Sequence, residues 1–184
     1  FSLTGGIGLY AIEGEELGIF KAYTPKKTED GRIIVDPTSG LPQNGEYARV
    51  GSMNNKYQMG FSNTLTYKGV SLSFDIDVRH GGLMYSRTKS VEYFTGNAMQ
   101  TAYNDRNPWI IPNSVLATTD ANGNTVYVEN TIPLVSKTIY SYWDKGGSDM
   151  DAGFLVSKSY VKLRQVVLSW DLPRKWLSRT FLTG

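Results

Sequence analysis

The chain contains no cysteine, which excludes a disulfide framework and any metal site built on thiolates. Its single histidine, His80, cannot supply a metal site with several histidine ligands. The 19 basic and 17 acidic residues give a net charge of +2, and this balance argues against a nucleic-acid-binding surface. No run of about 18 apolar residues is present that would form a transmembrane helix, and no signal peptide is recognisable.

The clearest pattern is the alternation of apolar and polar side chains over residues 57–79. The mainly apolar face carries Tyr57, Met59, Phe61, Asn63, Leu65 and Tyr67 before Lys68-Gly69, and Val70, Leu72, Phe74, Ile76 and Val78 after it. The polar face carries Gln58, Gly60, Ser62, Thr64 and Thr66 in the first run, and Ser71, Ser73, Asp75, Asp77 and Arg79 in the second. Since side chains alternate faces along a strand, the pattern predicts two strands joined by a tight turn at Lys68-Gly69. Each strand is about as long as the roughly 9–11 residues that cross a bilayer.

A soluble sandwich and a membrane barrel would both produce this alternation. Small hydroxyls followed by Asp75, Asp77 and Arg79 suit the water-filled interior of a barrel, and Tyr57 and Tyr67 at the ends of the apolar face suit aromatic girdles. The alternation alone leaves a soluble all-β module open. The long connection predicted over residues 80–155 favours the membrane barrel, since such barrels have short turns on one side and long extracellular loops on the other.

The remaining segments predict further strands and one helix. Strands are expected over residues 1–12, 17–23 and 159–172, and small hairpins around residues 32–35 and 125–128. A helix is expected within residues 86–104, with Ser86 as N-cap and Gly96 as its stop. The two halves of the last strand place their apolar residues at opposite parity, which either a bulge near Arg164-Gln165 or an upper half that faces the barrel interior would explain. The chain both begins and ends in a strand-like segment, the second at residues 181–184. We therefore expect it to be a piece of a longer chain.

No catalytic constellation is present, so we predict a protein that is not an enzyme and has no cofactor or metal ion. The pair Asp75 and Asp77 fits a pore-lining pair balanced by Arg79 better than the acid and base of a glycosidase. Asp120 opens a turn sequence, and turn chemistry explains it better than calcium binding. The residues we predict to contact substrate from the barrel interior or the long loop are Asp75, Asp77, Arg79, His80, Trp109 and Tyr93.

Several segments carry a family resemblance. Residues 60–74, GFSNTLTYKGVSLSF, resemble a barrel segment of SusC-like (SusC/RagA) TonB-dependent outer-membrane transporters, and residues 77–82 continue it. Residues 107–115 and 128–131 look like a late extracellular loop of that family, and residues 160–173 are similar to a late strand. Where the family has Asn-Pro before its Gly-Phe strand, this chain has Asn54-Asn55, so we expect a differently shaped turn there.

The resemblance implies an all-β fold, an antiparallel transmembrane β-barrel of about 22 strands with long extracellular loops. Residues 1–184 would be the late part of that barrel, with plug domain and closing strand absent, and residues 80–155 a long extracellular loop. The family imports oligosaccharides or peptides across the outer membrane of Gram-negative cells. Its partners are a SusD-like surface lipoprotein and, through the plug, the TonB–ExbB–ExbD complex. The alternative is a soluble all-β carbohydrate-binding module.

Overall fold

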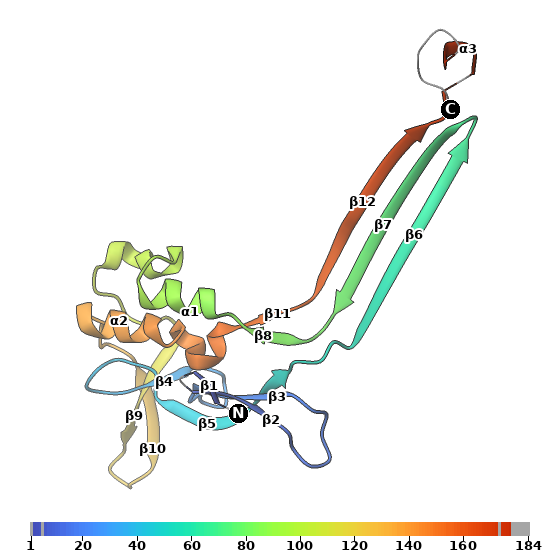
Figure 1. The fold of residues 1–184 in the computed structure, drawn as a ribbon. Helices are drawn as coiled ribbons and strands as arrows, with labels where there is room; N and C mark the ends of the chain where they lie inside the picture. Colours follow the sequence, from blue (N-terminus) through green and yellow to red (C-terminus); the bar gives the residue numbers. More distant parts are fainter. Residues whose placement is uncertain (1, 5, 173, 178–184) are drawn as a thin grey trace. The chain divides into compact units, whose positions relative to one another are not determined.

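The computed structural model describes residues 2–4, 6–172 and 174–177, which are predominantly β (Figure 1). In chain order the elements, with η for a 3-10 helix, are β1 (Ser2–Thr4), β2 (Ile7–Tyr10), β3 (Ile19–Pro25), β4 (Ile33–Val35), β5 (Asn44–Ser52), β6 (Tyr57–Tyr67), β7 (Val70–His80), β8 (Leu83–Tyr85), α1 (Arg87–Phe94), η1 (Met99–Arg106), β9 (Ser114–Thr119), β10 (Thr125–Glu129), α2 (Ser136–Asp144), η2 (Gly147–Phe154), β11 (Leu155–Ser157), β12 (Tyr160–Trp170) and α3 (Arg174–Leu177). No helix in these ranges is long and apolar enough to cross a membrane. The strand-like residues 181–184 lie outside the described part.

The chain divides into two compact units. Unit 1 combines the residues up to Asn54 with Leu83–Ser157, and unit 2 combines Asn55–Gly82 with the described residues from Lys158 onward. The segment predicted as a long loop therefore carries regular structure and packs with the first part of the chain. Its position outside a membrane stays a prediction.

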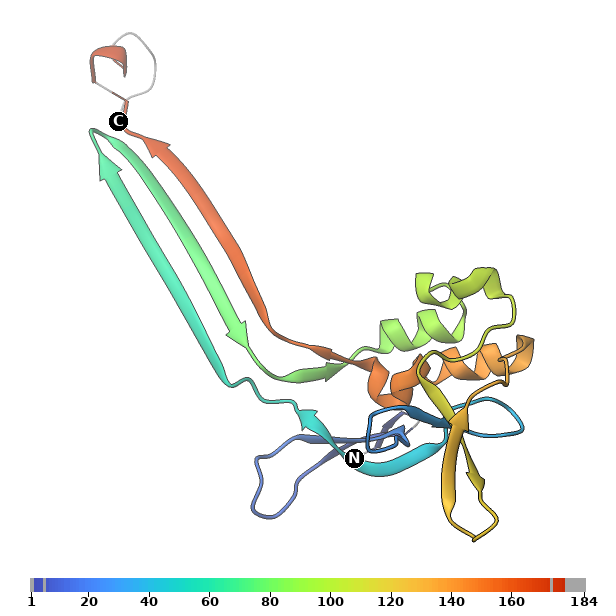
Figure 2. The same ribbon diagram turned by 180° about the vertical axis from the view of Figure 1, so that it is seen from behind.

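Unit 2 is an antiparallel sheet in which β7 lies between β6 and β12 (Figure 2). The predicted hairpin is confirmed, and β6 pairs with β7 without interruption from Tyr57 opposite His80 to Tyr67 opposite Val70. Its two turn residues both have positive φ, 48° at Lys68 and 82° at Gly69. This is the turn geometry that matches the twist of the adjoining strands, and glycine adopts it without steric cost.

The predicted bulge in the last strand is confirmed at Arg164. Leu163 pairs with Ile76 and Gln165 pairs with Asp75, so Arg164 is one extra residue in β12. The extra residue changes the parity of β12 at this point. As a result, the apolar residues on both sides of the bulge share a face with those of β7; they are Val161, Leu163, Val166, Leu168 and Trp170.

Unit 1 holds a four-stranded antiparallel sheet in the order β1-β2-β3-β5, a three-stranded sheet in the order β10-β9-β4, and the β8–β11 pair. The strand predicted over residues 17–23 is confirmed as β3. The single strand predicted over residues 1–12 is wrong, because β1 and β2 pair with each other as two antiparallel strands.

The hairpin predicted around residues 32–35 is confirmed as a small antiparallel pairing, in which Lys27 lies opposite Ile33 across the intervening turn. The one at residues 125–128 is confirmed as β9–β10. β4 pairs in parallel with β9, which lies far along the chain. All three residues of β4 are buried, and a short run of consecutive apolar residues is typical of a strand covered on both faces. The predicted helix is also confirmed as α1: the Ser86 hydroxyl accepts a hydrogen bond from the Lys89 amide at 3.2 Å, and Gly96 follows the helix with φ of 72°.

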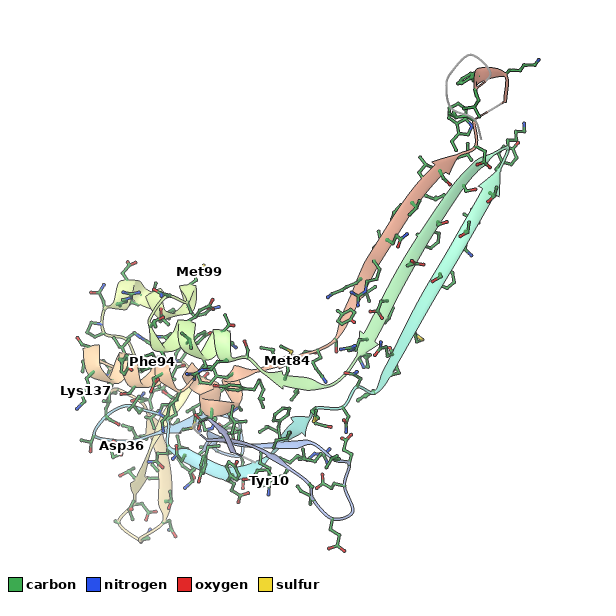
Figure 3. All side chains as sticks on the ribbon, in the orientation of Figure 1. Tyr10, Asp36, Met84, Phe94, Met99 and Lys137 are labelled. Carbon is green, nitrogen blue, oxygen red and sulfur yellow. The ribbon has the colours of Figure 1, made fainter. Side chains whose placement is uncertain are left out.

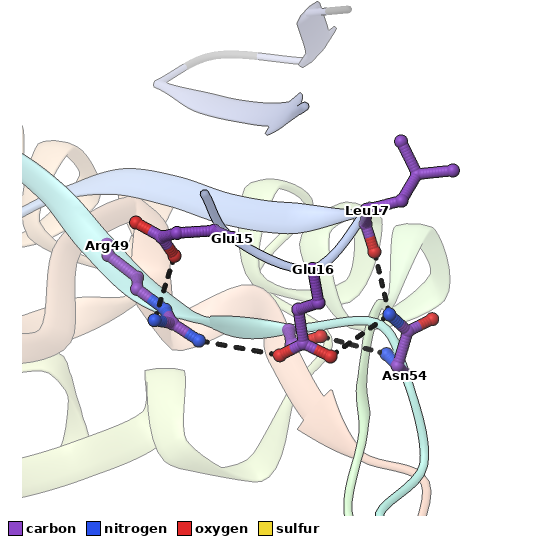
Figure 4. A network of polar contacts seen from close by, with 6 residues as sticks. Glu15, Glu16, Leu17, Arg49 and Asn54 are labelled. Carbon is purple, nitrogen blue, oxygen red and sulfur yellow. Dashed lines mark hydrogen bonds and ion pairs between the residues drawn. The ribbon is translucent and has the colours of Figure 1, made fainter. Parts of the chain in front are cut away.

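The connection between β2 and β3 is fastened to β5 by a polar network (Figure 4). The Arg49 guanidinium forms salt bridges with Glu15 at 2.8 Å and with Glu16 at 3.4 Å. The Asn54 amide donates to Glu16 Oε2 at 3.1 Å and to the Leu17 carbonyl at 2.7 Å. Asn54, directly before the position where the resemblance departs from the family, thus uses its side chain to hold the end of unit 1 against this connection.

Candidate functional site

The polar face of unit 2 brings together three of the predicted substrate contacts. Asp75, Asp77 and Arg79 occupy alternate positions of β7 and share one face of the sheet. Toward the Lys68-Gly69 turn this face carries hydroxyl pairs across β6 and β7, Thr64 with Ser73 and Thr66 with Ser71, each with oxygens 2.9 Å apart.

The charged end of this face is completed by β12, whose side chains sequence reasoning missed. The Tyr160 hydroxyl donates to Asp77 Oδ2 at 2.8 Å, and Arg164 Nη2 donates to the same oxygen at 2.6 Å. Two further cations lie over the Tyr160 ring: Lys162 Nζ is 4.5 Å and the Arg79 guanidinium carbon 5.3 Å from its centroid. Such cation–π contacts stabilise a cation at an aromatic face. The sequence signal that could have placed Arg164 on this face is the bulge, because the extra residue sets which face each later residue of β12 occupies.

Arg79 has hydrogen-bonding capacity left over. Its Nη2 donates to Gln58 Oε1 at 3.2 Å, while its Nε is buried and has no hydrogen-bond partner in the described part of the chain. This end of the face thus offers guanidinium and ammonium donors beside carboxylate acceptors, a combination that suits polar or charged solutes.

His80 does not belong to this polar face. It pairs with Tyr57 at the end of the hairpin, and the two rings stack with centroids 5.0 Å apart and planes 23° apart. His80 therefore shares the apolar face, which follows from its having the same parity as Val78. His80 therefore lies on the side of the sheet opposite to a solute on the polar face.

Trp109 and Tyr93, the two predicted contacts in unit 1, are buried in its core. Trp109 is 9% exposed and lies edge-to-face against Tyr142 at 5.2 Å and Tyr103 at 4.8 Å between ring centroids. Tyr93 is 8% exposed and packs edge-to-face on Trp143 at 5.8 Å. The structure thus supports a role in core packing for both side chains.

The Asp120 turn has the side-chain hydrogen bonds that turn chemistry predicts. Asp120 Oδ1 accepts the backbone N–H groups of Asn122 and Asn124, both at 2.8 Å. Hydrogen bonds from Asn124 are the main reason that the pKa of the Asp120 carboxyl lies below its usual range. In the described ranges no group of three or more histidine, cysteine, aspartate or glutamate side chains is placed to hold a metal ion.

Asp151 in η2 is a partly buried carboxyl, and burial disfavours its ionised form. Burial raises its pKa, against the opposing effects of Lys145 and of a hydrogen bond from the Gly6 backbone. Because the folded-state pKa exceeds the unfolded value of about 3.9, stability falls as pH rises through the interval between the two.

We expect Asp151→Asn to raise the unfolding free energy at pH 7, and this gain to vanish below about pH 3.9, where aspartate is protonated in both states. Denaturant titrations of the variant and the parent at the two pH values measure it. Asp149→Asn, in the same η2 segment but exposed, is the matched control and should change stability little. An equal gain at both pH values would contradict the assignment to ionisation.

No model of a known protein family matches the chain, and no curated protein matches it. The family resemblance of the sequence therefore stays a prediction. Two structural features bear on the function. Unit 2 is a sheet with one apolar face and one polar face that is charged at one end, and unit 1 has an aromatic core with helices.

Proposed function

We propose that β6, β7 and β12 are membrane-spanning strands of an outer-membrane β-barrel, and that the chain is the late part of the barrel of a SusC-like TonB-dependent importer of oligosaccharides or peptides. Each strand has 11 residues, the length that a tilted strand needs to cross a bilayer. The observation that carries the proposal is the uncovered apolar face of these strands.

The apolar side chains of this face are exposed on β6 and β12, while Phe74, Ile76 and Val78 of the central strand β7 are partly buried. Phe61 is 55% exposed and Leu168 72% exposed, values far from those of core residues. Neither of the two buried hydrophobic clusters in the described part of the chain contains a residue of unit 2. Figure 3 shows side chains on both faces of β6, β7 and β12, with no second layer of unit 2 over either face. An apolar face of this size is stable in contact with lipid and unstable in water.

Aromatic side chains lie toward both ends of the same face. Tyr57 and His80 stack at one end, and Tyr67 lies next to the turn at the other. Trp170 ends β12 and meets Trp176 of α3 edge-to-face with centroids 5.5 Å apart. Tyrosine and tryptophan are enriched where a barrel meets the lipid headgroups, since their rings have an apolar body and a polar atom.

The sheet also requires neighbours on both sides. In the described part of the chain β6 pairs only with β7, and so does β12, so each has one edge of unpaired backbone groups. Hydrocarbon does not tolerate such edges, and a closed barrel removes them. The proposal therefore includes further strands on both sides of unit 2.

The polar face would then line the barrel interior, with Asp75, Asp77 and Arg79 beside the path of the imported solute. In the whole importer, a SusD-like lipoprotein would cover the substrate and TonB–ExbB–ExbD would supply energy through the plug. A soluble carbohydrate-binding module, the alternative, would need a second sheet packed on the apolar face.

Purification from its native cells tests the proposal. We expect the protein in the outer-membrane fraction, soluble only with detergent and accompanied by a surface lipoprotein, and loss of uptake of one oligosaccharide or peptide on deletion of its gene. Without detergent, the 184-residue chain should aggregate. A monodisperse protein in the soluble fraction would contradict the barrel.

A further inference from the structure

A pocket of about 360 Å³ opens in unit 1 beside α1, η1 and α2. Its volume lies within the roughly 300–1,000 Å³ of small-molecule sites. Among the side chains that line it are Tyr93, Phe94, Arg106, Ile139, Tyr140 and Trp143. All of them belong to unit 1, so the pocket does not depend on whether the strands of unit 2 cross a membrane.

The aromatic wall of the pocket is unusual because part of it is exposed. Phe94 is 55% exposed and Tyr140 48% exposed, and their rings meet edge-to-face with centroids 6.1 Å apart. Behind them Tyr93 and Trp143 pack into the core and hold the wall in place. Such a wall offers ring faces and edges to a flat apolar surface of a ligand.

Arg106 lines the same pocket. The backbone that places it there is strained. Asn104, Asp105 and Arg106 have consecutive φ values of 52°, 51° and 61°. Left-handed backbone is tolerated by asparagine and aspartate but disfavoured for arginine, and three such residues in a row are rare. Strained residues of this kind cluster at ligand sites, where the surrounding structure keeps them in place. The Asn104 amide helps by donating to the Pro108 carbonyl at 3.1 Å.

The Arg106 side chain has one anchor and no counter-ion. Its Nη2 donates to the Gly96 carbonyl at 2.8 Å, which fixes one side of the guanidinium. It forms no salt bridge with any residue in the described ranges. A guanidinium has five N–H donors in a planar fork that fits a carboxylate, so an anchored and unneutralised arginine is suited to an anion.

We propose that this pocket binds a small carboxylate carried on a six-membered ring, with the carboxylate on Arg106 and the ring against Phe94 and Tyr140. The positive charge selects the anion, and the aromatic wall selects a ring over an open chain. Such a ligand has two chemical sources, an acidic sugar or an aromatic acid, which share the carboxylate and the ring. The site goes beyond the proposed importer and stands on unit 1 alone.

The test is a ligand-observed NMR titration of the full chain in detergent micelles, with D-glucuronate and benzoate as probes. Their neutral counterparts, D-glucose and benzyl alcohol, measure the contribution of the charge. We expect at least one anion to bind at least tenfold more tightly than its counterpart. Binding of glucuronate alone would identify an acidic sugar as the source, and binding of benzoate alone an aromatic acid. If neither anion binds more tightly than its neutral counterpart, the proposal is wrong.

Variants then assign the binding to named residues. Arg106→Gln should weaken the anion at least tenfold, and Arg106→Lys less, since lysine keeps the charge without the fork. Phe94→Ala should weaken it too. Arg87→Gln, an exposed arginine of α1 that does not line the pocket, is the matched control and should bind like the parent. Near-ultraviolet circular dichroism reports whether each variant is folded. Parent-like affinity in Arg106→Gln would overturn the proposal, as would an equal loss in the Arg87→Gln control.

Discussion

Phe74→Arg is expected to destabilise insertion into a bilayer by about 2–4 kcal/mol, the cost of arginine at the mid-membrane lipid face of a barrel. Phe74 lies near the middle of β7 and belongs to the apolar face with Phe61, whose ring centroid is 6.0 Å away. In the proposed barrel this face meets lipid acyl chains, where a guanidinium loses its hydration. Urea titration of the protein in lipid vesicles measures the change in the free energy of folding.

Ser73→Arg is the matched control for this prediction. Ser73 is the adjacent residue of β7 but lies on the polar face, where its hydroxyl oxygen is 2.9 Å from that of Thr64. The new arginine would reach water in the barrel interior, so we expect a change well below that of Phe74→Arg. Equal effects of the two substitutions would contradict the assignment of one face to lipid and the other to water.

Trp109→Ala is expected to destabilise unit 1 by about 3–5 kcal/mol, the usual cost of truncating a buried tryptophan. The indole is part of a buried cluster and contacts the rings of Tyr103, Tyr142 and Trp143. Its removal takes apolar area away from that cluster and leaves a cavity that the neighbouring rings fill only in part. Denaturant unfolding followed by near-ultraviolet circular dichroism, which reports on packed aromatic side chains, measures the loss.

Tyr127→Ala provides the comparison for this large effect. Tyr127 lies in β10 and is exposed, so we expect its truncation to change stability by no more than about 0.5 kcal/mol. A small effect of Trp109→Ala, similar to that of Tyr127→Ala, would mean that Trp109 does not hold the core together. The substrate contact that the sequence predicts for Trp109 would then be the better explanation of this residue.

Local patterns predicted unit 2 well. The alternation over residues 57–79 and the Lys68-Gly69 turn act between neighbours in the chain, so pairing and register follow from them. The bulge was predictable because Leu163 and Val166 have opposite parity and both had to reach the apolar face. The same parity argument, applied to His80, would have placed it on the apolar face.

Unit 1 was less predictable because its strands and helices pair far along the chain. The parallel contact of β4 with β9 leaves no periodic signal near residues 32–35. The β5 strand was missed because two glycines, Gly45 and Gly51, interrupt its alternation. The α2 helix did carry a signal, since Ile139, Tyr142 and Trp143 have the spacing of one helix face. Because no helix was predicted at these residues, the core against which Trp109 packs was not predicted either.

Cysteine scanning of β7 is the most direct test of the central proposal, that one face of this sheet meets lipid and the other meets water. The chain has no cysteine, so each residue from 70 to 80 can be replaced singly and carry a nitroxide label in the bilayer-inserted protein. Collisions with oxygen, which concentrates in lipid, should peak at even positions such as Leu72, Phe74 and Ile76. Collisions with a water-soluble nickel complex should peak at odd positions such as Ser73 and Asp75. Protection of the even positions from both reagents would indicate a packed protein core and would contradict the membrane barrel.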